Sequence, residues 1–278
     1  MNIQQQLPPS HLGEGPGVRA NSRIKDLFHH KPQHLLNVYC TAGYPQLNST
    51  REVMKALQDN GADLIEIGIP YSDPLADGPV IQASGSKAIE NGMTVSKLFE
   101  QLKDCRKEIH VPLILMGYFN QVLQYGFEKF CAAAQDVGVD ALILPDLPMY
   151  EFETEYGAIV KKYGLDFIFL VTPETSEERI KKLDGLSSGF LYAVSSSSTT
   201  GKDKNLTDQE AYFKRLKELN LKNPVLVGFG IKDKDTFEKA CSYANGAIIG
   251  TAYIKALEGS NDVTQATKKF LKSVLNIE

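Results

Sequence analysis

The sequence predicts an α/β fold, a closed (β/α)8 barrel of the TIM type with extra helices, and three observations support this prediction. Eight short apolar runs follow one another along 278 residues, a length that suits one such barrel or two ordinary domains. The runs are almost continuously hydrophobic, as strands are when both faces of a parallel sheet are covered. Amphipathic stretches of helical length separate them. An open doubly wound sheet also alternates in this way, but eight repeats favour closure.

The expected elements follow from the alternation of these two patterns. A short helix is predicted at 23–30, where RIKDLFHH begins the ordered chain. The runs predict strands at 35–40, 64–69, 112–117, 141–145, 166–171, 189–194, 224–230 and 246–251. The amphipathic stretches between them predict helices at 49–60, 94–106, 127–135, 149–163, 177–183, 208–219 and 233–243. Thr251 opens a further helix, and a last one closes the domain at about 262–275.

The chain is interpreted as a single domain over residues 23–278, preceded by a disordered extension over residues 1–22. The extension mixes Gln, Pro and Gly without periodicity, which is typical of segments that cannot bury a core. For the chain as a whole, a hydrophobic content of 42% and a charged content of 23% are those of a soluble globular protein.

Charge and cysteine usage exclude several classes of function. A formal charge of −4 gives no sign of the excess positive charge that binds nucleic acid or an anionic membrane. No apolar run approaches the roughly 20 residues of a membrane span. The four cysteines have no C-x-x-C spacing, so we expect reduced thiols in a cytoplasmic protein. They are Cys40, Cys105, Cys131 and Cys241.

Two carboxylates stand out in LIEIGIPYSDPLADGP, residues 64–79. Glu66 interrupts an apolar strand, where burial raises the pKa of a carboxyl group toward the range useful for acid–base catalysis. Asp77 follows in a Gly- and Pro-rich turn that is exposed to solvent, so we expect it to stay ionised. Two carboxyl groups in different environments can divide a proton-transfer reaction between them. The alternatives are a structural ion pair for Glu66 and simple turn chemistry for Asp77.

Glycines gather after the last predicted strands. Gly228 and Gly230 end the seventh strand, while Gly250 and Thr251 lie between the eighth strand and a helix. Barrels commonly bind a phosphate here through backbone N–H groups and the start of a short helix. Gly201, in the hydroxyl-rich loop SSSSTTGKD, joins this predicted phosphate site. The alternative is that these are ordinary turn glycines.

The remaining candidates narrow the chemistry. Tyr192 within the sixth strand and Tyr118 after the third either fill the barrel or bond to an acidic group, since a buried phenol needs a partner. No histidine lies at a strand end, which argues against a His-ligated metal, and no strand carries an interior lysine for a Schiff base. These observations favour metal-free acid–base chemistry on a phosphorylated small molecule.

Several motifs resemble those of one family, the tryptophan synthase alpha chains. IEIGIPYSDPLADGPVIQ resembles the family signature, and the resemblance covers roughly residues 23–278. Supporting matches are TAGYP (41–45), MGYFN (116–120), LPDLP (144–148), LVTPET (170–175), VGFGI (227–231) and IIGTA (248–252).

The resemblance implies a reaction and a partner. The reaction is the retro-aldol cleavage of indole-3-glycerol phosphate to indole and glyceraldehyde 3-phosphate. Indole then passes through an internal tunnel to a beta chain, whose pyridoxal phosphate serves to join it to serine in an α2β2 heterotetramer. The resemblance assigns neither a metal nor a cofactor to this chain itself.

The resemblance also implies roles for individual residues. Glu66 matches the acid–base glutamate, Asp77 the aspartate that accepts the indole N–H, and Tyr192 a strand-six tyrosine of the site. The implied phosphate site comprises Gly201, Gly230, Gly250 and Thr251. The implied indole pocket comprises Tyr39, Met116, Tyr118, Ile143, Leu170, Thr200 and Phe229. The loop at 71–78 is expected to face the beta chain through Tyr71, Ser72 and Asp73.

One loop departs from the family pattern. After strand six the family usually reads S-x-x-G-V-T-G, whereas this chain has SSSSTTG, with Ser198 and Thr199 in place of Gly and Val. The closing motion of this loop and its coupling to the partner could therefore differ. Two alternative functions stay open on sequence alone: another phosphate-binding barrel enzyme such as an isomerase, and a non-catalytic barrel that activates a partner.

Overall fold

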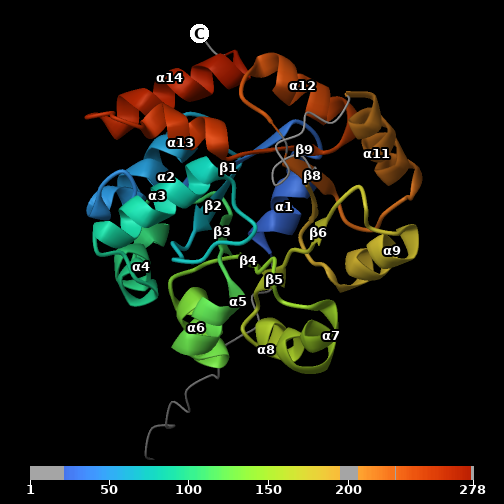
Figure 1. The fold of residues 1–278 in the computed structure, drawn as a ribbon, viewed down its shortest axis with the longest axis horizontal. Coiled ribbons are helices and arrows are strands. Elements are labelled where there is room, and N and C mark those ends of the chain that lie inside the picture. The colour runs from blue at the N-terminus through green and yellow to red at the C-terminus, as the bar shows by residue number, and fades with distance from the viewer. Residues whose placement is uncertain (1–21, 195–205, 229, 277–278) are drawn as a thin grey trace, which may run out of the picture.

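The computed structural model describes residues 22–194, 206–228 and 230–276, which form a barrel of strands inside a ring of helices (Figure 1). The strand order is β5-β4-β3-β2-β1-β9-β8-β7-β6, and all neighbours pair in parallel. The strands are β1 (Leu35–Thr41), β2 (Leu64–Gly68), β3 (Leu113–Met116), β4 (Ala141–Ile143), β5 (Asp166–Phe167), β6 (Leu170–Val171), β7 (Leu191–Val194), β8 (Val225–Gly228) and β9 (Gly246–Ile249). The predicted α/β barrel is confirmed.

The sheet closes through a single stretch of chain. β5 and β6 stand at opposite ends of the strand order, yet only two residues separate them. The N–H of Ile168 donates to Leu142 O of β4 at 3.0 Å, and Phe169 O accepts from the N–H of Tyr192 of β7 at 3.0 Å. The stretch thus forms hydrogen bonds with both β4 and β7. The strand predicted at 166–171 is therefore present as one extended segment, whose regular pairing is interrupted between β5 and β6.

The helices surround this barrel (Figure 1). They are α1 (Arg23–His30), α2 (Thr50–Asp59), α3 (Pro79–Glu90), α4 (Val95–Leu102), α5 (Phe119–Tyr125), α6 (Phe127–Asp136), α7 (Met149–Glu151), α8 (Gly157–Lys162), α9 (Glu177–Leu186), α11 (Leu206–Glu218), α12 (Lys234–Tyr243), α13 (Thr251–Leu257) and α14 (Val263–Leu275).

The helices differ from the prediction in three places. Helix α3 was not predicted, because the residues it buries are small, Ser84, Gly85 and Ala88, and give no apolar periodicity. Helix α5 was also missed, since it has only seven residues. The helix predicted at 149–163 is interrupted by a π-helical segment, Phe152–Tyr156, between α7 and α8.

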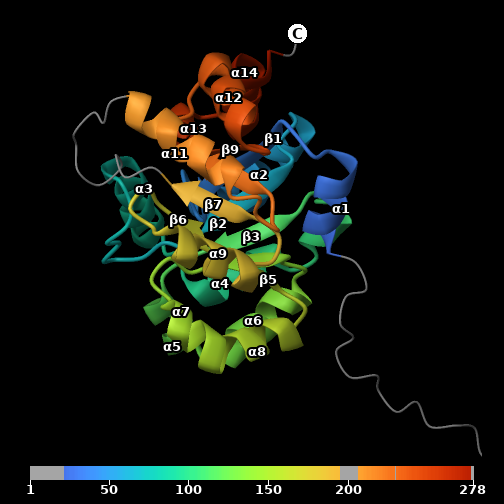
Figure 2. The same ribbon diagram turned by 90° about the vertical axis from the view of Figure 1, so that its right-hand side faces the viewer.

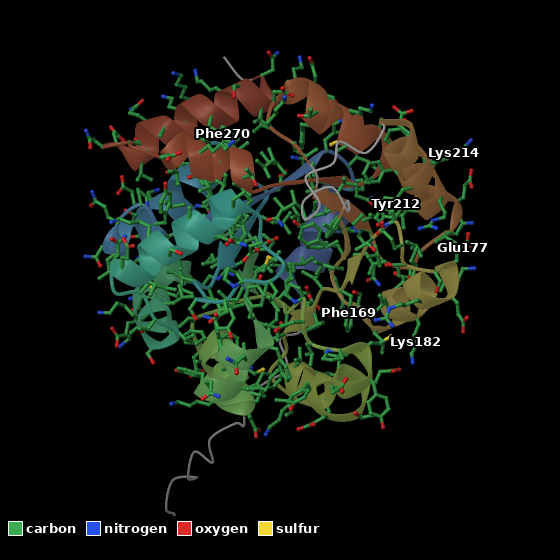
Figure 3. All side chains as sticks on the ribbon, in the orientation of Figure 1. Phe169, Glu177, Lys182, Tyr212, Lys214 and Phe270 are labelled. Carbon is green, nitrogen blue, oxygen red and sulfur yellow. The ribbon has the colours of Figure 1, made fainter. Side chains whose placement is uncertain are left out.

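Two apolar layers hold the barrel together. Inside it, alternate strand residues such as Leu64 and Ile114 pack with Ile24 of α1 and with Phe190, which precedes β7. Figure 2 shows α1 at one end of the barrel, which it closes. Outside it, buried side chains such as Phe169 fill the layer beneath the helices, whereas charged side chains of α9 and α11 lie at the periphery (Figure 3).

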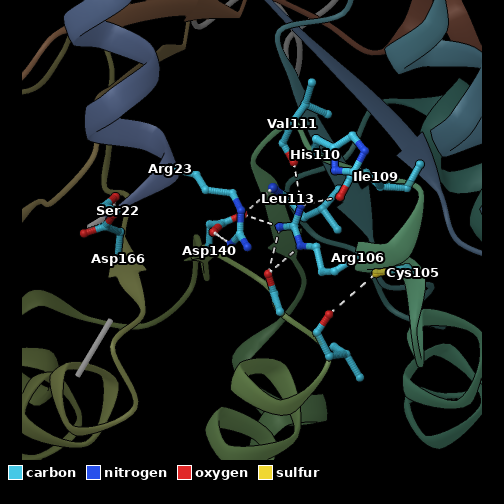
Figure 4. Close-up of polar contacts among 12 residues, drawn as sticks. Ser22, Arg23, Cys105, Arg106, Ile109, His110, Val111, Leu113, Asp140 and Asp166 are labelled. Carbon is cyan, nitrogen blue, oxygen red and sulfur yellow. Dashed lines mark hydrogen bonds and ion pairs between the residues drawn. The ribbon is translucent and has the colours of Figure 1, made fainter. Parts of the chain in front are cut away.

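An ion-pair network fixes α1 to the barrel (Figure 4). The buried carboxylate of Asp140 accepts from Arg23 of α1 at 2.7 Å, from Arg106, and from the N–H of Leu113 at 2.8 Å. Arg106 also donates through Nη2 to Gly138 O and through Nη1 to Val111 O, at 2.7 Å in each case. The network therefore ties the starts of β3 and β4 to the helix that closes the barrel.

We predict that Asp140→Ala lowers the free energy of unfolding by roughly 3–5 kcal/mol, since it leaves guanidinium groups without their buried counter-charge. Asp59→Ala is the matched control. It removes the exposed Lys55–Asp59 pair on α2, and we expect a much smaller effect because solvent screens this pair. Urea unfolding of both variants measures the difference, and equal losses would contradict the structural role of Asp140.

Candidate active site

The inner face of the barrel brings several of the predicted residues together. Tyr39 of β1 lies opposite Glu66 of β2, and Glu66 lies opposite Ile114 of β3. Ile114 packs inside the barrel, and side chains alternate along a strand, so Glu66 shares the interior face with it. The carboxyl ends of the strands form one rim, where barrel enzymes place their chemistry.

Glu66 is almost completely buried, with 1% of its surface exposed. Burial raises the pKa of its carboxyl group to about 8, and the nearby Asp77 carboxylate adds to this rise. One hydrogen bond opposes the shift: Asn37 Nδ2 donates to Glu66 Oε2 at 2.9 Å. Within residues 22–194, 206–228 and 230–276, no lysine or arginine pairs with Glu66, so the structural ion pair considered from sequence is absent there.

Asp77 is less exposed than its turn sequence predicts. The side chain is half-buried, and burial raises the pKa of its carboxyl group. The Tyr118 hydroxyl donates to Asp77 Oδ2 at 3.1 Å and opposes that rise. The same hydroxyl accepts from the N–H of Ala76 at 3.0 Å. Tyr118 therefore holds both the loop backbone and the carboxylate.

Two tyrosines lie over glycines on neighbouring strands. A Cβ at Gly68 would overlap the Tyr39 hydroxyl, and one at Gly228 would overlap the Tyr192 ring. Burial, with Glu66 and Asp77 nearby, raises the pKa of both phenols well above the usual value. Each glycine thus makes room for a neutral phenol beside the acidic pair.

The predicted pocket residues lie on the same interior face. Met116 pairs in register with Ile143, and Leu170 pairs with Tyr192. All four contact the interior cluster of the barrel. Two further predicted pocket residues, Thr200 and Phe229, lie outside the described residues.

The candidate phosphate residues are partly described. Gly230 has a φ of +51°, a left-handed conformation that favours glycine, and a Cβ at this position would have no other atom within 4 Å. Gly250 precedes α13, and a Cβ there would lie 3.5 Å from Tyr39 Cβ, beside the pocket. Thr251, the first residue of α13, is exposed, and Gly201 lies outside the described residues.

The predicted partner loop is connected to the site. Ser72 and Asp73 are exposed, and Leu75 in the same loop is 91% exposed. Tyr71 stacks on the ring of Tyr118, with 5.1 Å between ring centroids. The side chain of Tyr118 therefore links Tyr71, at the start of this loop, to Asp77 near its end.

Asn37, which holds Glu66, was not predicted from the sequence. A usable signal was present, because Asn37 is a polar residue within the apolar run LLNVYC, as Glu66 is within LIEIGI. The packing of Tyr39 over Gly68 was also missed, since it depends on strands brought together only by the fold.

The described residues contain no group of three or more side chains able to hold a metal ion. Over the same part of the chain, no helix is both long enough and apolar enough to cross a membrane.

Comparisons with known proteins show the family of this chain. The family model "Tryptophan synthase alpha chain" matches residues 27–278. The chain is 55% identical over 227 residues to the Flavobacterium johnsoniae tryptophan synthase alpha chain, covering 81% of this chain and 90% of that one. It is 52% identical over 254 residues to the Christiangramia forsetii protein of the same name, covering 90% and 97%.

Solved structures that resemble this chain come from the same family. The tryptophan synthase alpha chain from Legionella pneumophila superposes with a TM-score of 0.83 at 34% identity, covering 92% of this chain and 97% of that one. A chain of the Pyrococcus furiosus tryptophan synthase complex gives 0.80 at 34% identity, covering 88% and 99%. The family model and relatives more than 50% identical over most of the chain thus identify this barrel, with two carboxyl groups at its mouth, as a member of the tryptophan synthase alpha chain family.

Proposed function

We propose that Glu66, Asp77 and Tyr192 carry out the lyase reaction of this family, the cleavage of indole-3-glycerol phosphate to indole and glyceraldehyde 3-phosphate. The observation that carries the proposal is the buried carboxyl group of Glu66, whose pKa is about 8. A carboxylic acid that keeps its proton at neutral pH is the group needed to protonate a carbon atom of indole.

Glu66 acts twice in the proposed reaction. It first donates its proton to C3 of the indole ring, which converts the ring to an indoleninium-like cation. The resulting carboxylate then removes the proton of the adjacent side-chain hydroxyl. The bond from C3 to the side chain breaks, its electrons return to the ring, and the oxygen becomes the aldehyde of glyceraldehyde 3-phosphate. Glu66 ends the cycle protonated.

Asp77 stabilises the cation formed between these two steps. Its carboxylate accepts the N1–H of indole and lies where positive charge develops. The Tyr118 hydroxyl supports the ionised form by donating to Oδ2. Tyr192 and Tyr39, whose phenols stay neutral because burial raises their pKa, fill the space beside the pair.

The rest of the substrate meets the other predicted residues. Met116, Ile143 and Leu170 offer the indole ring an apolar wall on the interior face. The space beside Gly230 is open to a phosphate, and we assign Gly250, Thr251 and Gly201 to the same site. Thr200 and Phe229 complete the assigned pocket.

The partner is a tryptophan synthase beta chain, and the proposed assembly is an α2β2 heterotetramer. Tyr71, Ser72 and Asp73 are assigned to its interface. Because Tyr71 stacks on Tyr118, which bonds to Asp77, contact with the partner can act on the catalytic aspartate. Pyridoxal phosphate is assigned to the beta chain alone. The four cysteines form no disulfide, in keeping with the proposed cytoplasmic location.

The direct test mixes the chain with indole-3-glycerol phosphate, with and without a beta chain, and follows indole. We expect indole release, faster in the complex. An isomerised product without indole would favour another barrel enzyme, and a beta chain activated without any cleavage would favour a non-catalytic activator.

We predict that Glu66→Gln lowers kcat in the complex by roughly 10²–10⁴-fold, the usual contribution of an acid–base group. In the wild type, kcat/KM should fall as the pH rises through about 8, because Glu66 of the free enzyme must hold the proton. Steady-state kinetics from pH 6 to 10 measure both. A Glu66→Gln variant with most of its activity would remove Glu66 from the mechanism.

The same substitution should stabilise the protein near neutral pH. A buried acid whose pKa is raised costs no stability below its unfolded pKa, and the cost grows until the pH reaches about 8. Glutamine removes this cost, so we expect an increase in unfolding free energy on the order of 1–3 kcal/mol at pH 7 and none at pH 4. Denaturant unfolding at both values measures it, and an equal effect at both would contradict the assigned pKa.

For Asp77→Asn we predict a loss of roughly 10²–10³-fold in kcat, because the amide cannot neutralise the ring cation. Asp136→Asn, an exposed aspartate at the end of α6, is the matched control and should leave kcat unchanged. Both are assayed as complexes at saturating substrate. A near wild-type rate for Asp77→Asn would exclude its role.

A further inference from the structure

We propose that Asn37 is a positioning residue for Glu66, whose side-chain amide holds the carboxyl group in place and can pair with it in both of its protonation states. This role rests on the acid–base function proposed above for Glu66. It follows from the position of Asn37 in the barrel, from the chemistry of its amide, and from the other groups around the carboxyl.

Asn37 lies inside the barrel, next to the layer of side chains that contains Tyr39 and Glu66. It precedes Tyr39 by two residues on β1, and Tyr39 lies opposite Glu66, so the Asn37 side chain shares the interior face one step deeper. Asn37 Nδ2 donates to Glu66 Oε2 at 2.9 Å. Asn37 is 0% exposed and Glu66 1% exposed, so no bulk water competes for this bond.

The amide offers more than this single donor. Asn37 Oδ1 is buried and accepts no hydrogen bond from the described part of the chain. Buried acceptors without partners are rare because they cost free energy. Half a turn about the terminal side-chain bond exchanges Nδ2 and Oδ1. The amide can therefore donate to the carboxylate or accept from the protonated carboxyl group, and Glu66 passes between these forms twice per turnover.

Among the described residues, the other ionisable groups that interact electrostatically with Glu66 are all weak acids. They are Tyr39 and Cys40 on β1, Asp77 in the loop after β2, and Tyr192 on β7. Burial and Asp77 raise the pKa of Glu66, and the bond from Asn37 lowers it. Asn37 thus limits how tightly Glu66 holds its proton, which matters because Glu66 must also release it.

The test uses Asn37→Leu, which keeps the approximate size and removes the hydrogen bond, and Asn37→Asp, which keeps the shape and removes the donor. Leu35→Met, two residues earlier on the same interior face, controls for a disturbed barrel interior. All are prepared as full chains in complex with the beta chain. The Glu66 carboxyl is titrated by NMR with ¹³C-labelled glutamate, its signal being the one lost in Glu66→Gln.

We expect both Asn37 variants to raise the pKa of Glu66, and with it the pH at which kcat/KM falls, by roughly one pH unit, a tenfold change in proton affinity. In Asn37→Asp the two carboxyl groups titrate as a coupled pair, and the upper pKa of that pair shifts in the same direction. At pH 7, kcat should fall about tenfold while KM changes less than about twofold, since the lost interaction serves the reacting form. Leu35→Met should shift neither the titration nor the pH profile.

An unshifted Glu66 titration with an unshifted pH profile in the Asn37 variants would overturn the proposal, even if kcat fell, because packing alone would then explain the loss. If Asn37→Leu does not fold by circular dichroism, Asn37→Asp decides alone. Failure of the proposed function has a different signature: Glu66→Gln would cleave the substrate normally, while the titration would still report whether Asn37 holds the carboxyl group.

Discussion

The burial of one carboxyl group inside the barrel is the constraint on which the rest of the site depends. Removing Glu66 from water without a cation favours its protonated form. The barrel makes this possible because α1 closes its interior at one end, where Asp140 ties that helix to the starts of β3 and β4. The stabilising ion-pair network and the proposed chemistry thus lie at opposite ends of the strands, as is common in barrels.

The site contains two acids held in different ways. Glu66 is fixed by an amide from the neighbouring strand, whereas Asp77 is fixed by a phenol from the loop after β3. The Glu66 side chain is deeply buried, whereas the Asp77 side chain is half-buried, next to the proposed partner interface. This division suits a reaction in which proton transfer needs fixed geometry and charge stabilisation is linked to a second protein.

The fold class, most of the elements and the two carboxylates could be predicted from the amino-acid sequence. Continuous apolar runs and helical periodicity are local signals. A carboxylate within an apolar strand departs from the hydrophobic pattern around it, and the sequence alone shows this departure. Helix α3 packs through small residues and so gives no apolar periodicity. The continuous apolar run at 166–171 does not reveal that its pairing with the neighbouring strands is interrupted between β5 and β6.

Which side chains meet depended instead on the folded chain. Asn37 contacts Glu66, Tyr39 covers Gly68, and Tyr118 bonds to Asp77 across 41 residues of sequence. These pairs depend on strand register and on loops folding over the rim, and neither is encoded in any one segment. Because the environment of a carboxyl group sets its pKa, the direction of each shift follows only once the surrounding residues are in place.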